Sequence, residues 1–241
     1  MAARSSNFPQ GEQRRNQPVA EALATTSLFR VLSNEGITAT VGAGRSRNYS
    51  AGQIICHQGD LGDHLYVVID GLTKVVFTSE RGDEMVLNIL GPGEIFGELA
   101  LLDGSLRSAS VVALQSTSVF ILPRNRLLEL MRQNPGLADE FLKSIGRLVR
   151  KLTEQVGDLA FLDLGGRLAK ILLQISARHA HAQGLVLDRE FTQSDLAGMI
   201  GASRPAVNRA LQSLAARGLI AVRGRVVEIR DLEGLKRRAE L

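Results

Sequence analysis

Cysteine is nearly absent from this 241-residue chain, in which Cys56 stands alone. A single cysteine excludes an intrachain disulfide and a cluster of thiolate ligands for zinc or an iron–sulfur centre. Long apolar runs are missing as well, and none approaches the roughly 18–20 residues that a membrane-spanning helix requires. We therefore expect no membrane span and no metal centre. The four histidines lack the spacing of metal ligands on a helix, and we interpret them as surface or packing residues, with a haem site as the alternative: His57, His64, His179 and His181.

The N-terminus has no apolar centre of the kind that a secretory signal peptide carries. Residues 1–18 are rich in Ser, Asn, Gln, Arg and Pro, a composition typical of disorder. We expect a disordered tail over residues 1–20 and a location in the cytoplasm.

Charge is unevenly placed along the chain. Residues 21–160 carry 13 Lys or Arg and 16 Asp or Glu, whereas residues 161–241 carry 13 and 8. The net charge therefore changes from −3 to +5. A basic C-terminal part indicates that this end of the chain binds nucleic acid, although a modest excess of charge is also typical of a solvated surface.

Short apolar runs separated by glycine turns fill the chain between about residues 41 and 123. Many short strands with regular glycine turns predict a sandwich or barrel rather than a parallel sheet. A helix over about residues 21–32 is expected to precede them. The strand candidates are residues 53–56, 65–69, 73–77, 85–89, 110–113 and 118–122.

A long helix is predicted to start at Asn134 and Pro135, where proline suits the first turn. A helix of about 25 residues would be roughly 37 Å long, more than the core of a small domain needs. Packing against the strands would explain part of its apolar stripe, and a parallel two-helix interface explains the stripe better. We therefore expect a homodimer. The stripe consists of Phe141, Ile145, Leu148, Leu152, Val156 and Leu159.

Residues 93–109 combine the groups that would hold the phosphate ester of a nucleotide. Backbone N–H groups at the turn after Gly97 would bind an anion. Arg107 offers a guanidinium fork to phosphate oxygens, and Ser108 adds a hydroxyl donor. Glu98 would accept a hydrogen bond from a ribose hydroxyl. The segment predicts a nucleotide pocket that needs no metal; the alternative is a strand, a turn and a helix with a surface arginine.

Two short helices joined by a tight turn are predicted near the C-terminus. The first covers residues 193–200, with Thr192 and Asp195 as a capping box. Gly201 ends this helix, and Ser203 caps the second one, which has proline in its first turn. Two short strands then form a wing. This order indicates a winged helix-turn-helix with wing strands at residues 219–222 and 226–229.

The second of these helices has one apolar and one polar face. The apolar residues at positions 207, 210, 211 and 214 share a stripe that we expect to be buried. Arg204 at the N-terminal tip and Arg209 on the opposite face suit bidentate bonds to guanine, each worth about 1–3 kcal/mol of discrimination. An amphipathic helix with solvated arginines is the alternative, and the first helix and the wing argue against it. The predicted DNA contacts are Thr192, Gln193, Ser203, Arg204, Pro205, Asn208, Arg209, Gln212, Arg223 and Arg225.

The segments Phe-Gly-Glu-Leu-Ala-Leu at 96–101 and Arg-Ser-Ala at 107–109 resemble the phosphate-binding cassette of the cAMP receptor protein and FNR family of bacterial transcription regulators. The recognition segment of that family is similar to residues 201–211. The resemblance covers about residues 25–230 and points to the cAMP receptor protein branch, because the oxygen-sensing branch carries a cysteine-bound cluster. It implies an α+β architecture with a jelly-roll-like β-roll (21–133), a dimerisation helix (134–160) and a winged helix-turn-helix DNA-binding domain (161–241).

A hinge is also implied, because the Leu-Ala-Phe-Leu-Asp stretch at residues 159–163 is similar to the family's hinge. Gly165 and Gly166 are expected to interrupt the helix there, so that a new helix covers residues 167–177.

The resemblance implies a ligand-controlled regulator rather than an enzyme. Cyclic AMP is the first choice of effector, with cyclic GMP, cyclic di-GMP and constitutive activity without ligand as alternatives. In the family an adjacent Thr and Ser approach adenine; Leu152 and Thr153 stand at these positions, and Leu152 cannot hydrogen-bond the adenine amine. The implied pocket residues are Leu87, Asn88, Gly97, Glu98, Leu99, Ala100, Arg107, Ser108, Ala109, Leu152 and Thr153.

The implied partners are double-stranded DNA with a palindromic site, a second copy of the chain and RNA polymerase. Arg204 and Arg209 match the base-reading arginines of the family, whereas Pro205 replaces a glutamate that reads cytosine. We therefore expect an operator that differs at one base pair or more from the half-site that the cAMP receptor protein branch prefers.

A hydrolase or cupin-like metalloenzyme would need metal ligands or a nucleophile with its base, and neither is visible in the sequence. A regulatory subunit of a kinase or channel would share the cassette but not the winged helix-turn-helix.

Overall fold

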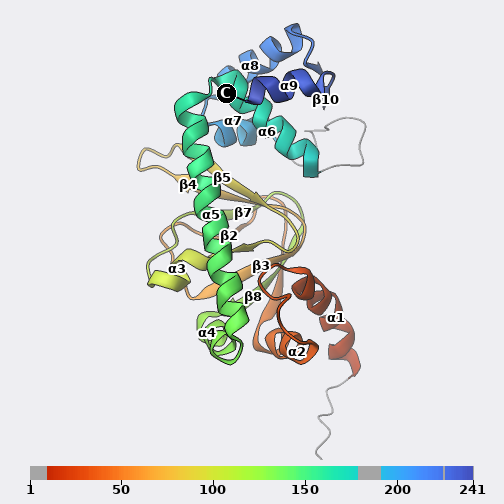
Figure 1. The fold of residues 1–241 in the computed structure, drawn as a ribbon, viewed down its shortest axis with the longest axis vertical. Coiled ribbons are helices and arrows are strands. Elements are labelled where there is room, and N and C mark those ends of the chain that lie inside the picture. The colour runs from red at the N-terminus through yellow and green to blue at the C-terminus, as the bar shows by residue number, and fades with distance from the viewer. Residues whose placement is uncertain (1–9, 179–190, 225, 241) are drawn as a thin grey trace, which may run out of the picture. The chain divides into compact units, whose positions relative to one another are not determined.

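The structure is a computed structural model that describes residues 10–178, 191–224 and 226–240 (Figure 1). The chain divides into two compact units that both draw on distant stretches of sequence. The first unit combines Met1–Thr73 with Leu90–Arg147, and the second combines Lys74–Ile89 with Leu148–Leu241. Residues 74–89, which the sequence assigns to the β-roll, thus belong to the same unit as the predicted DNA-binding domain.

Helices and strands are largely grouped in separate stretches of the chain, which is the α+β architecture expected. The helices are α1 (Gln10–Thr25), α2 (Asn34–Ala43), α3 (Glu98–Asp103), α4 (Arg124–Gln133), α5 (Pro135–Phe161), α6 (Leu164–Arg178), α7 (Gln193–Ile200), α8 (Arg204–Ala216) and α9 (Leu232–Ala239). The strands are β1 (Arg45–Tyr49), β2 (Ile54–Cys56), β3 (His64–Asp70), β4 (Thr73–Thr78), β5 (Glu84–Leu90), β6 (Ile95–Phe96), β7 (Ser110–Ala113), β8 (Thr117–Pro123), β9 (Ile220–Arg223) and β10 (Val226–Ile229).

The strands of the β-roll form two four-stranded sheets, in the orders β1-β8-β3-β6 and β2-β7-β4-β5. Strand β3 pairs antiparallel with β8, so that Leu65 lies opposite Leu122 and Val67 opposite Phe120. These four side chains are buried and contribute to the core of the first unit. All six predicted strands are present, whereas the strongly polar β1 and the two-residue β6 were not predicted.

Helix α1 begins at Gln10 and ends at Thr25, so the prediction of disorder through residue 20 and of a helix from 21 to 32 is wrong at both ends. Glutamine, glutamate and arginine are good helix formers, and a composition typical of disorder therefore also suits a helix. The C-terminal half of α1 is held by Val19 and Leu23, which are buried in the core of the first unit.

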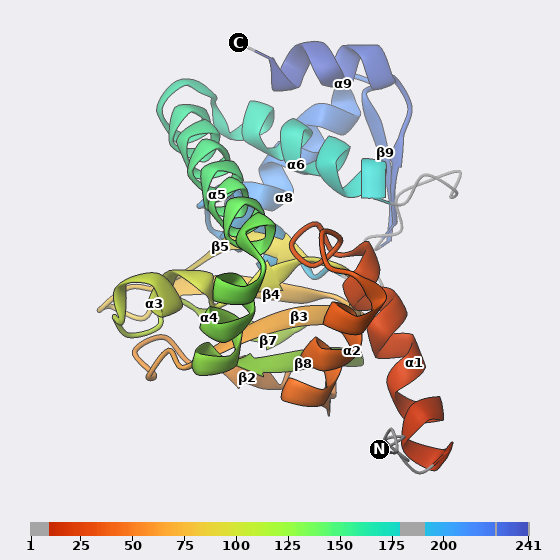
Figure 2. The same cartoon turned by 60° about the horizontal axis from the view of Figure 1, so that its bottom comes forward.

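Helix α2 was not predicted, although Ser33 marks its start. The Ser33 hydroxyl accepts a hydrogen bond from the Gly36 N–H at 3.2 Å, which satisfies one of the free N–H groups of the first turn. Ile37 and Val41 are buried. Figure 2 shows α1 and α2 side by side next to β3 and β8, where they cover the core of this unit.

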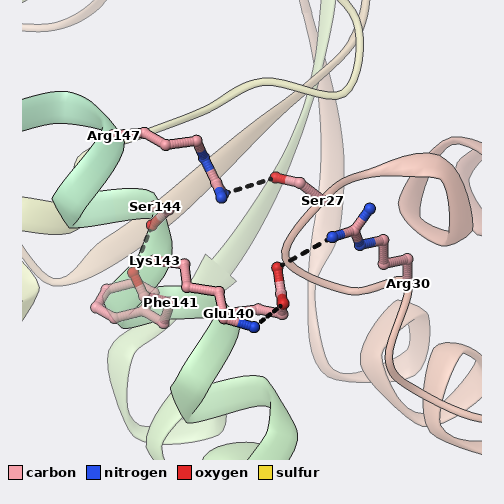
Figure 3. Close-up of polar contacts among 7 residues, drawn as sticks. All are labelled: Ser27, Arg30, Glu140, Phe141, Lys143, Ser144 and Arg147. Atoms are coloured by element: carbon pink, nitrogen blue, oxygen red, sulfur yellow. Dashed lines mark hydrogen bonds and ion pairs between the residues drawn. The ribbon is translucent and has the colours of Figure 1, made fainter. Parts of the chain in front are cut away.

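Helix α5 spans 27 residues, close to the predicted length, and its first half is anchored by a buried carboxylate (Figure 3). Glu140 accepts hydrogen bonds from Lys143 at 2.8 Å and from Arg30 at 3.5 Å. Arg147, one turn further on, donates to the Ser27 hydroxyl at 3.3 Å. The hydrogen bond from Lys143 and the charges of the two arginines lower the pKa of Glu140. These contacts fix α5 to the turn that follows α1.

Helix α6 starts at Leu164 and includes Gly165 and Gly166, so the predicted helix break at the two glycines is wrong. The break lies one step earlier, where the Asp163 carboxylate accepts a hydrogen bond from the Gly166 N–H at 2.8 Å. Arg238 of α9 binds the same carboxylate. A Cβ at Gly165 would lie 2.7 Å from the Arg238 guanidinium, so this glycine allows the side chain to approach the start of α6.

The second unit has its own core, formed where α6 packs against α7, α8 and α9. Strands β9 and β10 pair antiparallel, with Val227 opposite Val222, and form the predicted wing. The buried apolar side chains of this core are Leu168, Leu172, Leu196, Ile200, Val207, Leu211, Leu214, Ile220, Val227 and Leu235.

Candidate functional site

Gly97 forms the turn between β6 and α3 at which the cassette begins. Its φ of +84° lies in the left-handed region, which favours glycine. A Cβ at this position would lie 2.3 Å from the Arg107 Nη1 atom. Backbone conformation and space therefore both require glycine here, and the absence of a side chain lets the arginine reach the turn.

Arg107 is held inside the first unit with only 5% of its surface exposed. Its Nη1 donates to the Gly97 carbonyl at 2.8 Å, and its Nη2 donates to the His64 carbonyl at 2.7 Å. The guanidinium carbon lies 5.3 Å from the centre of the Tyr66 ring, within cation–π range. Sequence reasoning missed His64 and Tyr66 as partners, because nothing in the local pattern indicates which carbonyl or ring an arginine will meet.

The charge of Arg107 is not neutralised within the described part of the chain, where no carboxylate forms an ion pair with it. Its buried Nε atom also has no hydrogen-bond partner among these residues. A buried cation is costly unless an anion or strong acceptors compensate it. The arginine and its orphan donor therefore fit a negatively charged ligand such as a phosphate ester.

Glu98, the first residue of α3, is half-buried beside this arginine. Burial raises the pKa of the Glu98 carboxyl, and the positive charge of Arg107 acts in the opposite direction. The other predicted cassette residues divide by exposure: Leu99 and Ser108 are exposed, whereas Ala100 and Ala109 are buried. The structure thus brings the Arg107 side chain to the turn formed by Gly97 and Glu98, as the sequence predicts.

The four remaining residues of the predicted pocket belong to the second unit. The Leu87 carbonyl accepts a hydrogen bond from the Gln155 side chain at 2.8 Å, and the Asn88 side chain accepts one from Lys151. Leu152 is half-buried on α5. The exposed Thr153 donates to the Val149 carbonyl of its own helix at 2.9 Å. A role for these four residues in ligand binding stays a prediction.

The first helix of the helix-turn-helix starts at the predicted capping box. The Thr192 hydroxyl accepts from the Asp195 N–H at 3.1 Å, and the Asp195 carboxylate accepts from the Thr192 N–H at 2.8 Å. Gly201, with a φ of +62°, ends α7 and turns the chain into α8. The predicted bounds of α7 are confirmed.

Helix α8 has the two faces that the sequence predicts. Its four apolar positions are buried, and the predicted base-contacting residues Arg204, Pro205, Asn208, Arg209 and Gln212 are all exposed. Thr192, Gln193, Ser203 and Arg223 are exposed too, whereas Arg225 lies outside the described residues.

Ser203 is the N-cap residue of α8, as predicted, but its side chain does not take part in the cap. Its hydroxyl makes no capping hydrogen bond in the described structure. Pro205 occupies the second helical position and has no N–H, so one of the two usual donors to a capping side chain is missing.

Asp195 makes the stability of the second unit depend on pH. Burial raises the pKa of this carboxyl, but hydrogen bonds from Lys74 of β4 and from Thr192 outweigh burial and hold the pKa below its usual value. A lowered pKa in the folded state stabilises the protein above the usual aspartate pKa, and this contribution is lost as the pH falls through the lowered value.

In thermal unfolding by circular dichroism, the decrease in Tm from pH 5 to pH 3 should be smaller for Asp195→Asn than for the wild type. Asp83→Asn, at an exposed position of the same unit, should keep the wild-type decrease.

Within residues 10–178, 191–224 and 226–240, no group of three or more His, Cys, Asp or Glu residues is placed to hold a metal ion. Over the same ranges, no helix has both the length and the apolar composition needed to cross a membrane.

Two protein-family models match the chain, one in its N-terminal half and one in its C-terminal part. A cyclic nucleotide-binding domain covers residues 46–134, and a Crp-like helix-turn-helix domain covers residues 166–238. A CRP-like cAMP-activated global transcriptional regulator of Mycobacterium tuberculosis is 33% identical over 221 residues, which cover 91% of this chain and 99% of that relative. The chain belongs to the cAMP receptor protein/FNR family. As a member of this family of transcription regulators, the chain is a regulator with a cyclic nucleotide-binding domain and not an enzyme.

Other relatives in the family extend the similarity. The cyclic AMP receptor protein of Thermus thermophilus is 35% identical over 204 residues, which cover 85% of this chain and 92% of that relative. The solved structure of the Thermus thermophilus catabolite activator protein is 33% identical, covers 89% of this chain and 98% of its own, and has a TM-score of 0.52. The c-di-GMP responsive regulator CLP of Xanthomonas campestris, at 24% identity over 82% of this chain and 99% of its own, shares the fold with a TM-score of 0.73.

Proposed function

We propose that this family member is a cAMP-controlled homodimer that reads a palindromic operator. The observation that carries the proposal is Arg107, a buried arginine without a carboxylate partner among the described residues, placed at the Gly97–Glu98 turn of a cyclic nucleotide-binding domain. Its fork suits two phosphate oxygens of a cyclic phosphodiester. Glu98 would accept a hydrogen bond from the ribose 2′-hydroxyl, and Ser108 would add a donor to the phosphate.

Cyclic AMP is preferred over other effectors because relatives at 33% and 35% identity are named as cAMP-activated or cyclic AMP receptor proteins. At the positions expected to approach the base, Leu152 offers no hydrogen bond to an adenine amine and only Thr153 keeps a hydroxyl. Cyclic GMP and cyclic di-GMP are the competing effectors, and constitutive DNA binding is the competing behaviour. Each is one arm of the selection experiment below.

An exposed apolar stripe on α5 supports the homodimer. Leu142, Val149 and Val156 follow one another at seven-residue intervals, and between 56% and 65% of each is exposed. Ile145, Leu152 and Leu159 lie three residues after them and complete a heptad pattern. The sequence-based stripe included Phe141 instead of Leu142, but Phe141 is buried in the first unit. The seven-residue spacing of 142, 149 and 156 was the signal that could have found Leu142 and Val149.

Val149→Asp is expected to dissociate this homodimer. Burying a valine side chain is worth about 1.5–3 kcal/mol, and an unpaired carboxylate in each helix of the interface adds a further penalty. The dissociation constant should rise by about 100-fold or more in analytical ultracentrifugation. Arg150→Asp places the same carboxylate one residue away from the stripe and should leave the dimer intact. Equal dissociation by both variants would contradict the assignment of the stripe.

The recognition face supports sequence-specific DNA binding. Arg204 and Arg209 are exposed on α8 and suit bidentate bonds to guanine bases in the major groove. In a two-fold symmetric dimer, two such helices read half-sites one helical turn apart, about 34–36 Å, so the operator is a palindrome. Activity in the cytoplasm and a contact with RNA polymerase follow from the role of a bacterial transcription regulator.

The proposed control is a shift between conformations of the dimer. Arg107 and Glu98 would hold the effector from the first unit, and Thr153 would contact it from α5. Because these groups lie on different parts of the chain, the effector would favour the arrangement in which all of them reach it. We propose that this arrangement places both copies of α8 at the spacing of the operator.

Selection of binding sites from random double-stranded DNA tests the proposal. The full chain is used without effector and with cyclic AMP, cyclic GMP or cyclic di-GMP. Enrichment of a palindrome with cyclic AMP alone is the expected result. The same enrichment without any nucleotide would contradict ligand control. Enrichment with cyclic GMP or cyclic di-GMP instead would contradict cyclic AMP as the effector and identify that nucleotide in its place. Failure to enrich any palindrome would contradict the mode of DNA reading.

A further inference from the structure

The hairpin of β4 and β5 packs in the second unit, together with the helix-turn-helix. Lys74–Ile89, which contains this hairpin, shares that unit with Leu148–Leu241. The same hairpin carries Leu87 and Asn88, two of the residues that the sequence predicts to line the effector pocket. A single short element therefore links predicted ligand contacts to the DNA-reading helices of this unit.

An ion pair joins the hairpin to the first helix of the helix-turn-helix. The Lys74 ammonium lies 2.6 Å from a carboxylate oxygen of Asp195, and the two side chains are 20% and 6% exposed. Asp195 is also the acidic residue of the capping box, and its carboxylate accepts hydrogen bonds from the Thr192 N–H and hydroxyl. The lysine thus binds α7 at its N-terminus, where two other hydrogen bonds already fix the Asp195 carboxylate.

A close steric contact accompanies this ion pair. A Cβ at Gly198 of α7 would lie 2.8 Å from a methyl group of Val86 on β5, so only glycine allows the hairpin to lie this close. On its other side, β5 is bonded to α5, through Gln155 to the Leu87 carbonyl and through Lys151 to Asn88. The hairpin is therefore held between the long helix and α7.

We propose that Lys74 is a positioning residue for DNA recognition, which orients α7, and with it the recognition helix α8, by pairing with Asp195. This inference rests on the proposed function of the chain as a DNA-reading regulator. Helix α8 follows α7 after Gly201, Ala202 and Ser203, so a restraint on α7 is transmitted to α8. The ion pair fixes the orientation of the helix-turn-helix before DNA is met, which lowers the entropic cost of binding.

The pairing favours DNA binding and does not inhibit it, because the recognition face stays open while the contact is formed. Arg204, Arg209 and Gln212 are exposed in the same structure in which Lys74 binds Asp195. A contact that blocked DNA would have to cover these side chains. Loss of the ion pair should therefore weaken binding to the operator.

The test is the affinity of full-length Lys74→Met for the selected operator, measured by fluorescence anisotropy with and without cyclic AMP. Methionine keeps the length of the side chain and removes the charge, and the Asp195 carboxylate keeps its hydrogen bonds from Thr192. The operator affinity should fall about tenfold, and Lys74→Arg, which keeps a cation, should restore most of it. Gly198→Leu separates the same elements by a different route and should lower the affinity in the same direction. Circular dichroism confirms that each variant is folded.

Salt dependence separates positioning from a direct contact with DNA. A lysine that binds phosphate contributes about one to the slope of log affinity against log salt concentration, whereas a positioning lysine leaves the slope unchanged. An unchanged slope with a tenfold loss of affinity is the expected result. Equal affinity of Lys74→Met and wild type, a higher affinity, or a smaller slope would each overturn the inference. If the wild type itself binds no operator, the proposed function fails too, which distinguishes that outcome from failure of the inference alone.

Discussion

Replacement of Arg107 by alanine should remove nearly all affinity for the cyclic nucleotide. The proposed ligand phosphate loses a charge-assisted fork in a buried setting, and truncating one member of a buried charge pair costs about 2–5 kcal/mol. Since 1.4 kcal/mol corresponds to tenfold, the affinity measured by isothermal titration calorimetry should fall by about 100-fold or more. The free protein should lose some stability as well, because the Gly97 and His64 carbonyls lose their donor.

Two further variants control this experiment. Arg126→Ala removes the same charge from an exposed arginine of the first unit, which pairs only with Glu129 in the described structure, and should bind the nucleotide as the wild type does. Arg107→Lys keeps the cation without the planar fork, and should bind with an intermediate affinity. Unchanged nucleotide affinity of a folded Arg107→Ala variant would contradict the assignment of the pocket.

Replacement of Arg209 by alanine should relax operator specificity at one base pair of each half-site. A bidentate arginine–guanine contact is worth about 1–3 kcal/mol of discrimination against the wrong base, and the dimer makes the contact twice. The measurement is competition binding between the selected operator and operators changed at single positions. The variant should discriminate about 5- to 150-fold less at the position that Arg209 reads and should keep the wild-type preference elsewhere.

Arg237→Ala is the matched control for this loss of specificity. Arg237 is an exposed arginine of the same unit, on α9 instead of α8. Its removal should weaken binding to all sequences alike, by a small factor, if it changes binding at all. Preserved discrimination at every position by Arg209→Ala would show that this residue contacts only the DNA backbone.

Elements with a strong local signal could be predicted from the sequence. The capping box at Thr192 and the glycine at 201 mark both ends of α7, and the structure has the same bounds. The glycine turns between apolar runs locate six strands of the β-roll. These signals are local, because caps and turns depend on residues a few positions apart.

Elements without such a signal were missed or misplaced. The N-terminal half of α1 has the composition of a disordered segment, and α2 is short and weakly amphipathic. The start of α6 was placed after Gly165 and Gly166, whereas Asp163 determines it through its bond to the Gly166 N–H. For α6, a contact with a distant element contributes, that of Arg238 with Asp163, 75 positions away.

The candidate site divides in the same way. The residue types of the cassette and their spacing could be predicted, because Gly97, Glu98 and Arg107 lie within one short segment of the sequence. The Arg107 side chain points inward toward the His64 carbonyl and the Tyr66 ring, and these two residues of β3 lie more than 40 positions away in the sequence. The pairing of Lys74 with Asp195 spans 121 positions and has no sequence signal at all.

The most direct test of ligand control is the affinity of the wild-type protein for its selected operator, measured with and without saturating cyclic AMP at one salt concentration. Coupling between two sites in a protein is typically 1–3 kcal/mol, so we expect the nucleotide to raise the operator affinity about 5- to 150-fold. By reciprocity, the operator should raise the affinity for cyclic AMP by the same factor. Equal operator affinities in the two conditions, with cyclic AMP shown by calorimetry to be bound, would contradict the account.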